Sequence, residues 1–198
     1  MTPITFHFDV VSPFAYLAFE HLPEALEGVS HVVEYRPVLF AGLLKAHGHK
    51  GPAEIPPKRE WTFRQVDWLA AKLGQGAMRC PAPHPFNPLA LLRLSLACGP
   101  AGRMPNPRGV EILMRHVWRG HGADPNEPAR LASLRGELSP ERDPDSDEVK
   151  AELRALTDEA IAAGVFGVPS FVARGRLYWG LDALPMLRDD LLSAEAAP

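Results

Sequence analysis

A serine and a proline stand where the first predicted strand meets the first predicted helix. The stretch FDVVSPFAYL covers residues 8–17, and Ser12-Pro13 follows the alternating apolar residues of 4–10. A hydroxyl at a helix N-terminus can cap the first turn. It can also donate a hydrogen bond to an anion, which the free N–H groups and partial positive charge of that turn attract. The sequence leaves both roles of Ser12 open.

Two further segments near the C-terminus carry residues suited to ligand binding. GVPSFV (167–172) places a proline at the start of a strand, and X-Pro is the only linkage at which a cis peptide bond is inexpensive. LYWGLDAL (177–184) follows it, with Asp182 directly before the last predicted helix. An aspartate there can cap the helix, and its second oxygen remains free for a ligand.

Composition and charge exclude several classes of protein. The 198 residues are 46% hydrophobic and 23% charged, with a formal net charge of −3, so no basic patch indicates nucleic-acid binding. No apolar run approaches the roughly 18 residues of a membrane span. The N-terminal residues lack a secretory signal, and we therefore expect a cytoplasmic protein. Cys80 and Cys98 lie too far apart for a CxxC pair, which predicts two structural thiols and no metal site.

Periodicity predicts the elements that position these residues. We expect a strand over 4–10, a helix from Ser12 to about Leu22, and a second strand over 31–40. Helices follow at 58–73, 87–98, 108–119 and 145–163, the last beginning with a capping box of Asp145 and Glu148 after a polar turn at 139–147. Strands at 169–173 and 176–180 form a hairpin turning at Gly175, and a final helix covers 183–193.

This order of elements predicts an α/β fold. A strand, a crossover helix and a parallel strand open the chain, and a hairpin with a helix closes it. The pattern is typical of a thioredoxin-like core, over residues 1–41 and 164–198, with a large all-helical insertion over 42–163.

The three segments DVVSPFAY, GVPSFV and LYWGLDAL together resemble the DsbA-like branch of the thioredoxin fold. Within that branch they resemble the group of 2-hydroxychromene-2-carboxylate isomerases and kappa-class glutathione transferases. Disulfide-forming relatives open the first helix with Cys-x-x-Cys, whereas this chain has Ser12-Pro13-Phe14-Ala15. Dithiol exchange at this position is therefore chemically excluded.

The resemblance implies glutathione as the cofactor and assigns its contacts. Ser12 would be the catalytic residue that stabilises the glutathione thiolate, which lowers the pKa of the thiol. Asp182 would hold the γ-glutamyl amino group. Leu181 stands where the family has a small or polar residue, so only its backbone N–H is expected to contribute. The remaining expected cofactor contacts are Phe14, Lys58, Val168 and Pro169.

The helical insertion would supply the substrate contacts. PPKREW (56–61) resembles a Lys-x-x-aromatic segment of the family, which places Lys58 near a carboxylate and Trp61 near the substrate, although a solvated lysine at a helix start is an equal alternative. Trp68 stands where the family has an arginine. HPFNPLALLRL (84–94) resembles the segment that lines the substrate pocket, so His84 and Asn87 are expected there, with helix capping the alternative for Asn87.

The predicted function is that of a glutathione-dependent cis/trans isomerase of an aromatic 2-oxo acid or chromene carboxylate. The expected partner is a small aromatic carboxylate, with no nucleic acid and no membrane, and the resemblance implies a homodimer. The alternatives are a kappa-like glutathione transferase or peroxidase that uses the same site, and a non-catalytic DsbA-like binding protein.

Overall fold

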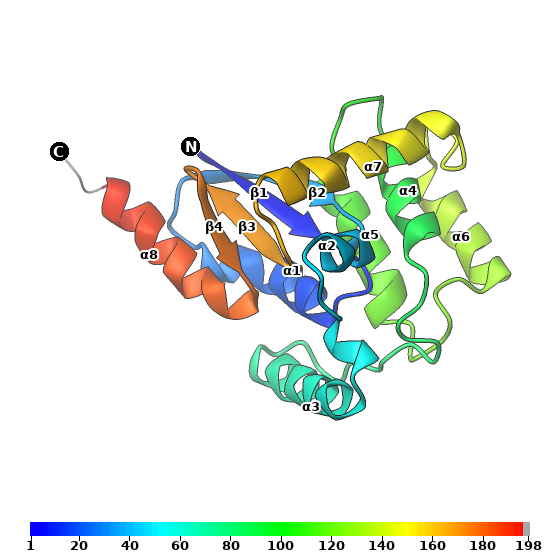
Figure 1. The fold of residues 1–198 in the computed structure, drawn as a ribbon, viewed down its shortest axis with the longest axis horizontal. Helices are drawn as coiled ribbons and strands as arrows, with labels where there is room; N and C mark the ends of the chain where they lie inside the picture. Colours follow the sequence, from blue (N-terminus) through cyan, green and yellow to red (C-terminus); the bar gives the residue numbers. More distant parts are fainter. Residues whose placement is uncertain (196–198) are drawn as a thin grey trace.

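A computed structural model describes residues 1–195 of the chain (Figure 1). Its elements are, in order, β1 (Thr2–Phe8), α1 (Pro13–Ala25), β2 (His31–Pro37), α2 (Phe40–Ala46), the 3₁₀ helix η1 (Pro52–Glu54), α3 (Pro56–Lys72), α4 (Leu89–Ala97), α5 (Pro107–Trp118), α6 (Pro128–Leu138), α7 (Asp147–Ala162), β3 (Ser170–Ala173), β4 (Arg176–Trp179), the 3₁₀ helix η2 (Leu181–Ala183) and α8 (Leu184–Glu195).

The four strands form one mixed sheet in the order β2-β1-β3-β4. β1 and β2 pair in parallel, with α1 as the crossover, and β3 pairs antiparallel with both β1 and β4. The hairpin between β3 and β4 turns at Arg174 and Gly175, whose φ angles of 52° and 75° suit a type I′ turn. The predicted thioredoxin-like order of elements is confirmed.

Helices cover both faces of this sheet. The side chains of Ile4, Phe6 and Phe8 in β1 are fully buried in the core cluster that also includes residues of α1 and α8. Phe6 stacks on Phe171 of β3 with 4.8 Å between ring centroids. A second cluster on α2 and α7 has Val172 of β3 packed against it. Because successive strand residues point to opposite faces, Phe171 and Val172 reach different helices.

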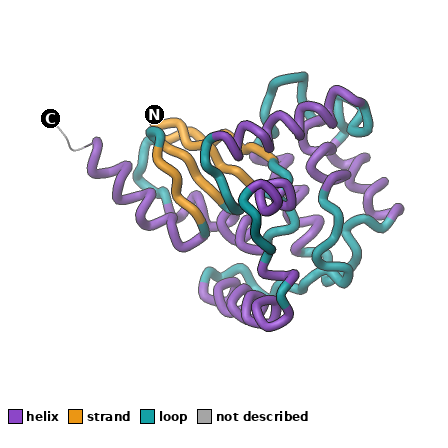
Figure 2. The backbone as a smooth tube through the Cα atoms, in the orientation of Figure 1, coloured by secondary structure: helices purple, strands orange, loops and turns teal. Residues whose placement is uncertain are grey.

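The remaining helices gather beyond one end of the sheet (Figure 2). Here α4 packs on α5 and α7, and α5 packs on α6. The main core cluster runs without a break from the sheet into these helices and includes the fully buried side chain of Trp118. The division into domains at 42 and 163 therefore stays a prediction.

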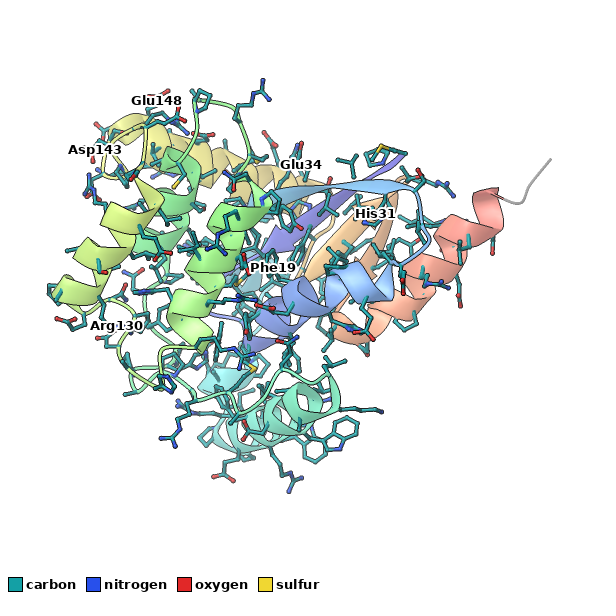
Figure 3. All side chains as sticks on the ribbon, turned by 180° about the vertical axis from the view of Figure 1, so that it is seen from behind. Phe19, His31, Glu34, Arg130, Asp143 and Glu148 are labelled. Carbon is teal, nitrogen blue, oxygen red and sulfur yellow. The ribbon has the colours of Figure 1, made fainter. Side chains whose placement is uncertain are left out.

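Helix α1 is held between the sheet and α5. In the view from behind, Phe19 lies on α1 beside β2, where its ring meets Tyr35 edge-on at 5.6 Å (Figure 3). On the other side of α1, Glu20 accepts two hydrogen bonds from Arg115 of α5, at 2.8 and 3.0 Å. These contacts fix the position of the helix whose N-terminus carries Ser12.

The structure corrects three of the local predictions. The strand expected over 31–40 ends at Pro37, and α2 begins at Phe40. Helices α2 and α6 were not predicted from the sequence. The N-cap of α7 is Ser146, whose Oγ accepts the Val149 N–H at 3.3 Å, rather than the expected Asp145. Residues 196–198 of the predicted core domain lie outside the described part of the chain.

Within residues 1–195, none of the helices combines the length and apolarity that crossing a membrane requires.

Candidate active site at the start of the first helix

A cavity of about 990 Å³ opens between the sheet and the helices that follow it. Its lining comes from the β1–α1 turn, α2, η1, α3, the segment before α4 and the loop before β3. Most of the lining is apolar, and aromatic rings are prominent in it. These rings include Phe14, Phe40, Phe63, Phe86, Phe166 and Trp179. The volume lies at the upper end of the range for small-molecule sites, roughly 300–1,000 Å³.

Ser12 lines this cavity at the N-cap of α1. Its Oγ accepts a hydrogen bond from Ala15 N–H at 3.2 Å, so the cap predicted from the sequence is present. The hydroxyl also donates to the carbonyl oxygen of Val168 at 3.3 Å. That separation is long for an O–H···O bond, which is usually about 2.5–3.0 Å. The Ser12 proton is therefore available to a stronger acceptor, such as an anion.

The loop before β3 lies beside Ser12 in the cavity wall. The Val168–Pro169 peptide bond is cis, and Gly180 N–H donates to the Pro169 carbonyl at 2.9 Å. Gly167 packs so closely that a Cβ there would lie 2.5 Å from Nε1 of Trp179. The Val168 N–H has no partner among residues 1–195, so an extended ligand can pair with it.

Two aromatic rings from the helical region hold the turn that carries Ser12. Trp118 donates from Nε1 to the Val10 carbonyl at 3.0 Å, and His84 donates from Nε2 to the Val11 carbonyl at 2.9 Å. Because a carbonyl oxygen only accepts, Nε2 of His84 carries the proton.

His84 is 7% exposed and lines the cavity. Burial lowers the pKa of its imidazole, which favours the neutral ring. Its Nδ1 is then a lone-pair acceptor, and that atom is buried with no hydrogen-bond partner in the described residues. A buried acceptor without a partner is costly, so His84 is suited to receive a proton or hydrogen bond from a ligand.

Asp9 ties the Ser12 turn to the start of α2. Its side chain is fully buried, and its two oxygens accept the N–H groups of Val11 at 3.0 Å and Phe40 at 2.9 Å. Burial raises the pKa of the Asp9 carboxyl to about 7, while the two backbone hydrogen bonds oppose this shift. The two segments that frame the cavity are thus joined through one carboxyl group.

The cysteines are placed away from this chemistry. Cys80 and Cys98 are free thiols, and their Sγ atoms donate to the carbonyls of Pro81 and Leu94. Burial raises the pKa of both thiols, which disfavours the reactive thiolate. Neither residue lines the cavity.

Four of the predicted site residues share the cavity: Ser12, Phe14, His84 and Val168. Pro169 is buried directly behind Val168. Leu181 and Asp182 lie in η2 and do not line the cavity; Leu181 is buried and Asp182 is exposed.

The other three predicted contacts lie outside the cavity lining. Lys58 is exposed near the start of α3, and the ring of Trp61 is 57% exposed, with the Arg64 guanidinium 4.5 Å from its centroid. Asn87 accepts the Leu89 N–H at 3.0 Å, so its side chain satisfies an N–H group at the start of α4, although the N-cap residue is Pro88. Their roles as ligand contacts stay predictions.

Sequence reasoning did not identify Asp9, nor three basic residues of the cavity, Lys45, His49 and Lys50. Asp9 had a usable signal, because it ends an alternating strand next to a predicted helix cap. The basic residues carry none, since they lie in or directly after a short helix, α2, that the periodicity did not reveal.

A second cavity, of about 320 Å³, lies between α5 and α6. Its three arginines are already engaged: Arg108 by Glu111, Arg115 by Glu20, and Arg130 by the Asp124 carbonyl. The guanidinium groups of this cavity therefore already bind partners within the protein.

Known proteins resemble this chain over nearly its full length. It is 28% identical over 196 residues to a 2-hydroxychromene-2-carboxylate isomerase of Sphingobium xenophagum, which covers 96% of this chain and 97% of that protein. It is 26% identical over 209 residues to glutathione S-transferase kappa 1 of Rattus norvegicus, covering 91% and 86%. A solved 2-hydroxychromene-2-carboxylate isomerase structure superimposes with a TM-score of 0.83 at 22% identity, over 99% of this chain and 100% of that one.

The model of the DSBA-like thioredoxin domain family matches residues 3–192, which include both sides of the cavity. The chain belongs to this family.

Proposed function

We propose that the protein is a glutathione-dependent cis/trans isomerase of an aromatic 2-oxo acid or chromene carboxylate. The observation that carries the proposal is the Ser12 hydroxyl, which lies at a helix N-terminus opposite the cis Val168–Pro169 bond in an aromatic cavity. The similarity to 2-hydroxychromene-2-carboxylate isomerases supports the same activity.

The residues present fit glutathione. The unpartnered Val168 N–H and the Val168 carbonyl offer one donor and one acceptor to an extended peptide, as a neighbouring strand would. Phe14 N–H, in the first turn of α1, also has no partner within residues 1–195 and is available to an anionic sulfur. A cavity of about 990 Å³ has room for both a tripeptide and an aromatic acid.

Glutathione, when bound, would supply a thiolate that adds to a conjugated carbon and leaves again after bond rotation, so that no net oxidation or reduction occurs. Ser12 would stabilise the anionic sulfur by turning its hydroxyl away from the Val168 carbonyl. The partial positive charge at the start of α1 acts in the same direction. The protein needs no nucleophile of its own for this chemistry.

The aromatic side chains would orient the substrate. Phe63 and Trp179 present rings to the cavity, and aromatic pairs prefer edge-to-face or offset packing. His84 would accept a hydrogen bond at Nδ1 from a substrate hydroxyl, because its other nitrogen is occupied by the Val11 carbonyl. Leu181, Asp182, Lys58, Trp61 and Asn87 remain candidate contacts by family resemblance alone.

A kappa-like glutathione transferase is the second candidate, since the chain is 26% identical to kappa-class glutathione transferases of rat and human. Both candidates need the same activated thiolate and differ in the electrophile. Isomerisation of a 2-hydroxychromene-2-carboxylate, compared with conjugation of a halogenated dinitrobenzene, separates them.

The experiment that tests the proposal is a glutathione titration across pH, followed by the ultraviolet absorbance of the thiolate. Wild type is compared with Ser12→Ala. The matched control is Ser146→Ala, which removes a second serine N-cap outside the cavity lining. We expect wild type and Ser146→Ala to lower the thiol pKa of bound glutathione below about 8.5, and Ser12→Ala to abolish most of that shift.

Two results would count against the proposal. Glutathione bound with an unshifted thiol pKa would favour the non-catalytic binding protein. An equal shift in wild type and Ser12→Ala would leave Ser12 as a helix cap only.

A further inference from the structure

We propose that Lys45 and Lys50, at the edge of the cavity, bind a carboxylate of its ligand. Lys45 belongs to α2 and Lys50 to the segment between α2 and η1, and both line the cavity. This inference rests on the proposed function, because it names the residues with which that site recognises an acidic ligand.

The charges around the cavity are distributed unevenly. Asp9 and Glu54 are the acidic residues of the lining, and both are engaged by the backbone: Asp9 by Val11 and Phe40, and Glu54 by Gly51 N–H at 2.7 Å. Within residues 1–195, no ion pair or hydrogen bond involves the ammonium group of Lys45 or Lys50. The two lysines therefore have no ion-pair partner in this part of the chain, and both lie on the segment from α2 to η1.

His47 holds this basic segment against the opposite wall. Its Nε2 donates to the Val165 carbonyl at 3.1 Å, and its ring packs edge-on against Phe166 at 6.5 Å. His49 stacks on His47, with 6.4 Å between centroids. The segment that carries both lysines is thus attached to the loop that leads into Val168.

The combination of a cationic edge and aromatic walls selects a particular ligand chemistry. Rings such as Phe63 and Trp179 favour a planar apolar body, and an ammonium group favours a carboxylate at one end of it. The glycine carboxylate of glutathione and the carboxylate of an aromatic substrate share this chemistry. The experiment below has a separate arm for each source.

Binding is measured by calorimetry with two matched pairs of probes. The first pair is glutathione and its glycine ethyl ester, and the second is chromone-2-carboxylate and chromone-2-carboxamide. The variants are Lys45→Gln, Lys50→Gln and the double substitution. Lys72→Gln is the matched control, because Lys72 is an exposed lysine of α3 that stacks on Trp68 outside the cavity.

We expect the double variant to bind at least one of the two carboxylates about tenfold more weakly than wild type. Its affinity for the second probe of that pair, which lacks the glycine carboxylate of glutathione or the carboxylate of the chromone, should stay within about twofold. A loss confined to the glutathione pair assigns the lysines to the cofactor, and a loss confined to the chromone pair assigns them to the substrate. Raising the salt concentration should lower the affinity of wild type for the carboxylate until it approaches that of the double variant.

Two outcomes would overturn the inference: equal binding of both carboxylates by the double variant and Lys72→Gln, or a wild type that binds neither. Failure of the proposed function has a different signature. In that case the thiol pKa of bound glutathione stays unshifted, whereas the charge dependence of the chromone pair still reports on Lys45 and Lys50.

Discussion

The two walls of the cavity are held in different ways. The inner wall, residues 9–14 and 166–168, is mostly buried, and the turn within it accepts hydrogen bonds from Trp118 and His84. The outer wall, residues 40–54 and 62–65, presents exposed lysines and a histidine. Buried hydrogen bonds therefore position the inner wall, whereas the outer wall presents charged side chains.

We therefore expect substitutions in the two walls to differ in their free-energy cost. A substitution in the inner wall disturbs buried hydrogen bonds, and each buried polar group left without a partner costs about 1–3 kcal/mol. A substitution in the outer wall removes a charge that water already solvates, which typically costs below about 1 kcal/mol. The predictions below test whether this difference is real.

The largest effect is expected at Asp9 and depends on pH. The folded-state pKa of about 7 lies above the ordinary value of 3.8, so between these values the folded protein holds a proton that the unfolded chain releases. The contribution to stability is therefore greatest below pH 3.8 and is lost as pH rises to about 7. Relative to Asp9→Asn, the wild-type free energy of unfolding should fall by about 1.4 kcal/mol per pH unit, about 4 kcal/mol in all.

Urea unfolding at a series of pH values measures this difference. The Asn side chain can accept only one of the two backbone N–H groups, which adds a cost that does not vary with pH. Burial lowers the pKa of His7 to about 4, so protonation of His7 destabilises the folded state at low pH. This effect should be the same in wild type and Asp9→Asn, and it cancels in the difference between them. If the free energy of unfolding of wild type and Asp9→Asn varied with pH in the same way, the raised pKa of Asp9 would be contradicted.

The next effect is expected at Ser12. Ser12→Ala should lower kcat about hundredfold, the usual loss when one donor to a developing anion is removed. The stability of the same variant should fall by about 1 kcal/mol, as for any lost serine N-cap. Steady-state kinetics and thermal unfolding measure the two quantities.

Ser146→Ala separates the two roles of the serine. It should lose the same stability as Ser12→Ala and keep wild-type kcat, since Ser146 caps α7 outside the cavity. A wild-type kcat for Ser12→Ala would show that the Ser12 hydroxyl takes no part in catalysis.

His84 should have a smaller effect. His84→Phe leaves the Val11 carbonyl without its donor, which should lower stability by about 2 kcal/mol and also reduce kcat through the loosened Ser12 turn. His116 provides the control, because its Nε2 donates to the Pro125 carbonyl at 2.9 Å beside the smaller cavity. His116→Phe should lose similar stability in urea unfolding and retain kcat.

The smallest effect is expected on the exposed face of α3. Lys58→Gln and Trp61→Ala should change KM less than about twofold and stability by less than about 0.5 kcal/mol, because both side chains lie outside the cavity. A tenfold rise in KM for either variant would support the ligand contact that the family resemblance implies. The exposed face of α3 would then belong to the ligand-binding surface.

The two turns of the inner wall were predictable because each has a signal in the local sequence. Ser12-Pro13 marks a helix start, and Val168-Pro169 marks the loop before a strand. Lys58 and Trp61 lie on a helix whose existence was predictable but whose rotation depends on packing. Helix α2 was missed because its seven residues continue an apolar strand pattern, so the lysines beside it had no predicted position.

Helix α6 was missed for a related reason. Its N-cap is Glu127, outside the group of residues that usually marks a helix start, although both carboxylate oxygens accept N–H groups of the first turn, at 3.0 and 2.9 Å. The fold class did not depend on it, because the strand and helix order around the sheet already defines the core.

The bonds from Trp118 and His84 to the Ser12 turn also limit how this protein can be re-engineered. The helical block is not an interchangeable cap on a self-sufficient scaffold, because donors 108 and 73 residues away from their acceptors help to define the turn. A chimera that imports another cap, to accept a new substrate, must therefore bring two ring N–H groups to the same carbonyls. A change of the helical block to alter the substrate range therefore also changes the support of the Ser12 turn.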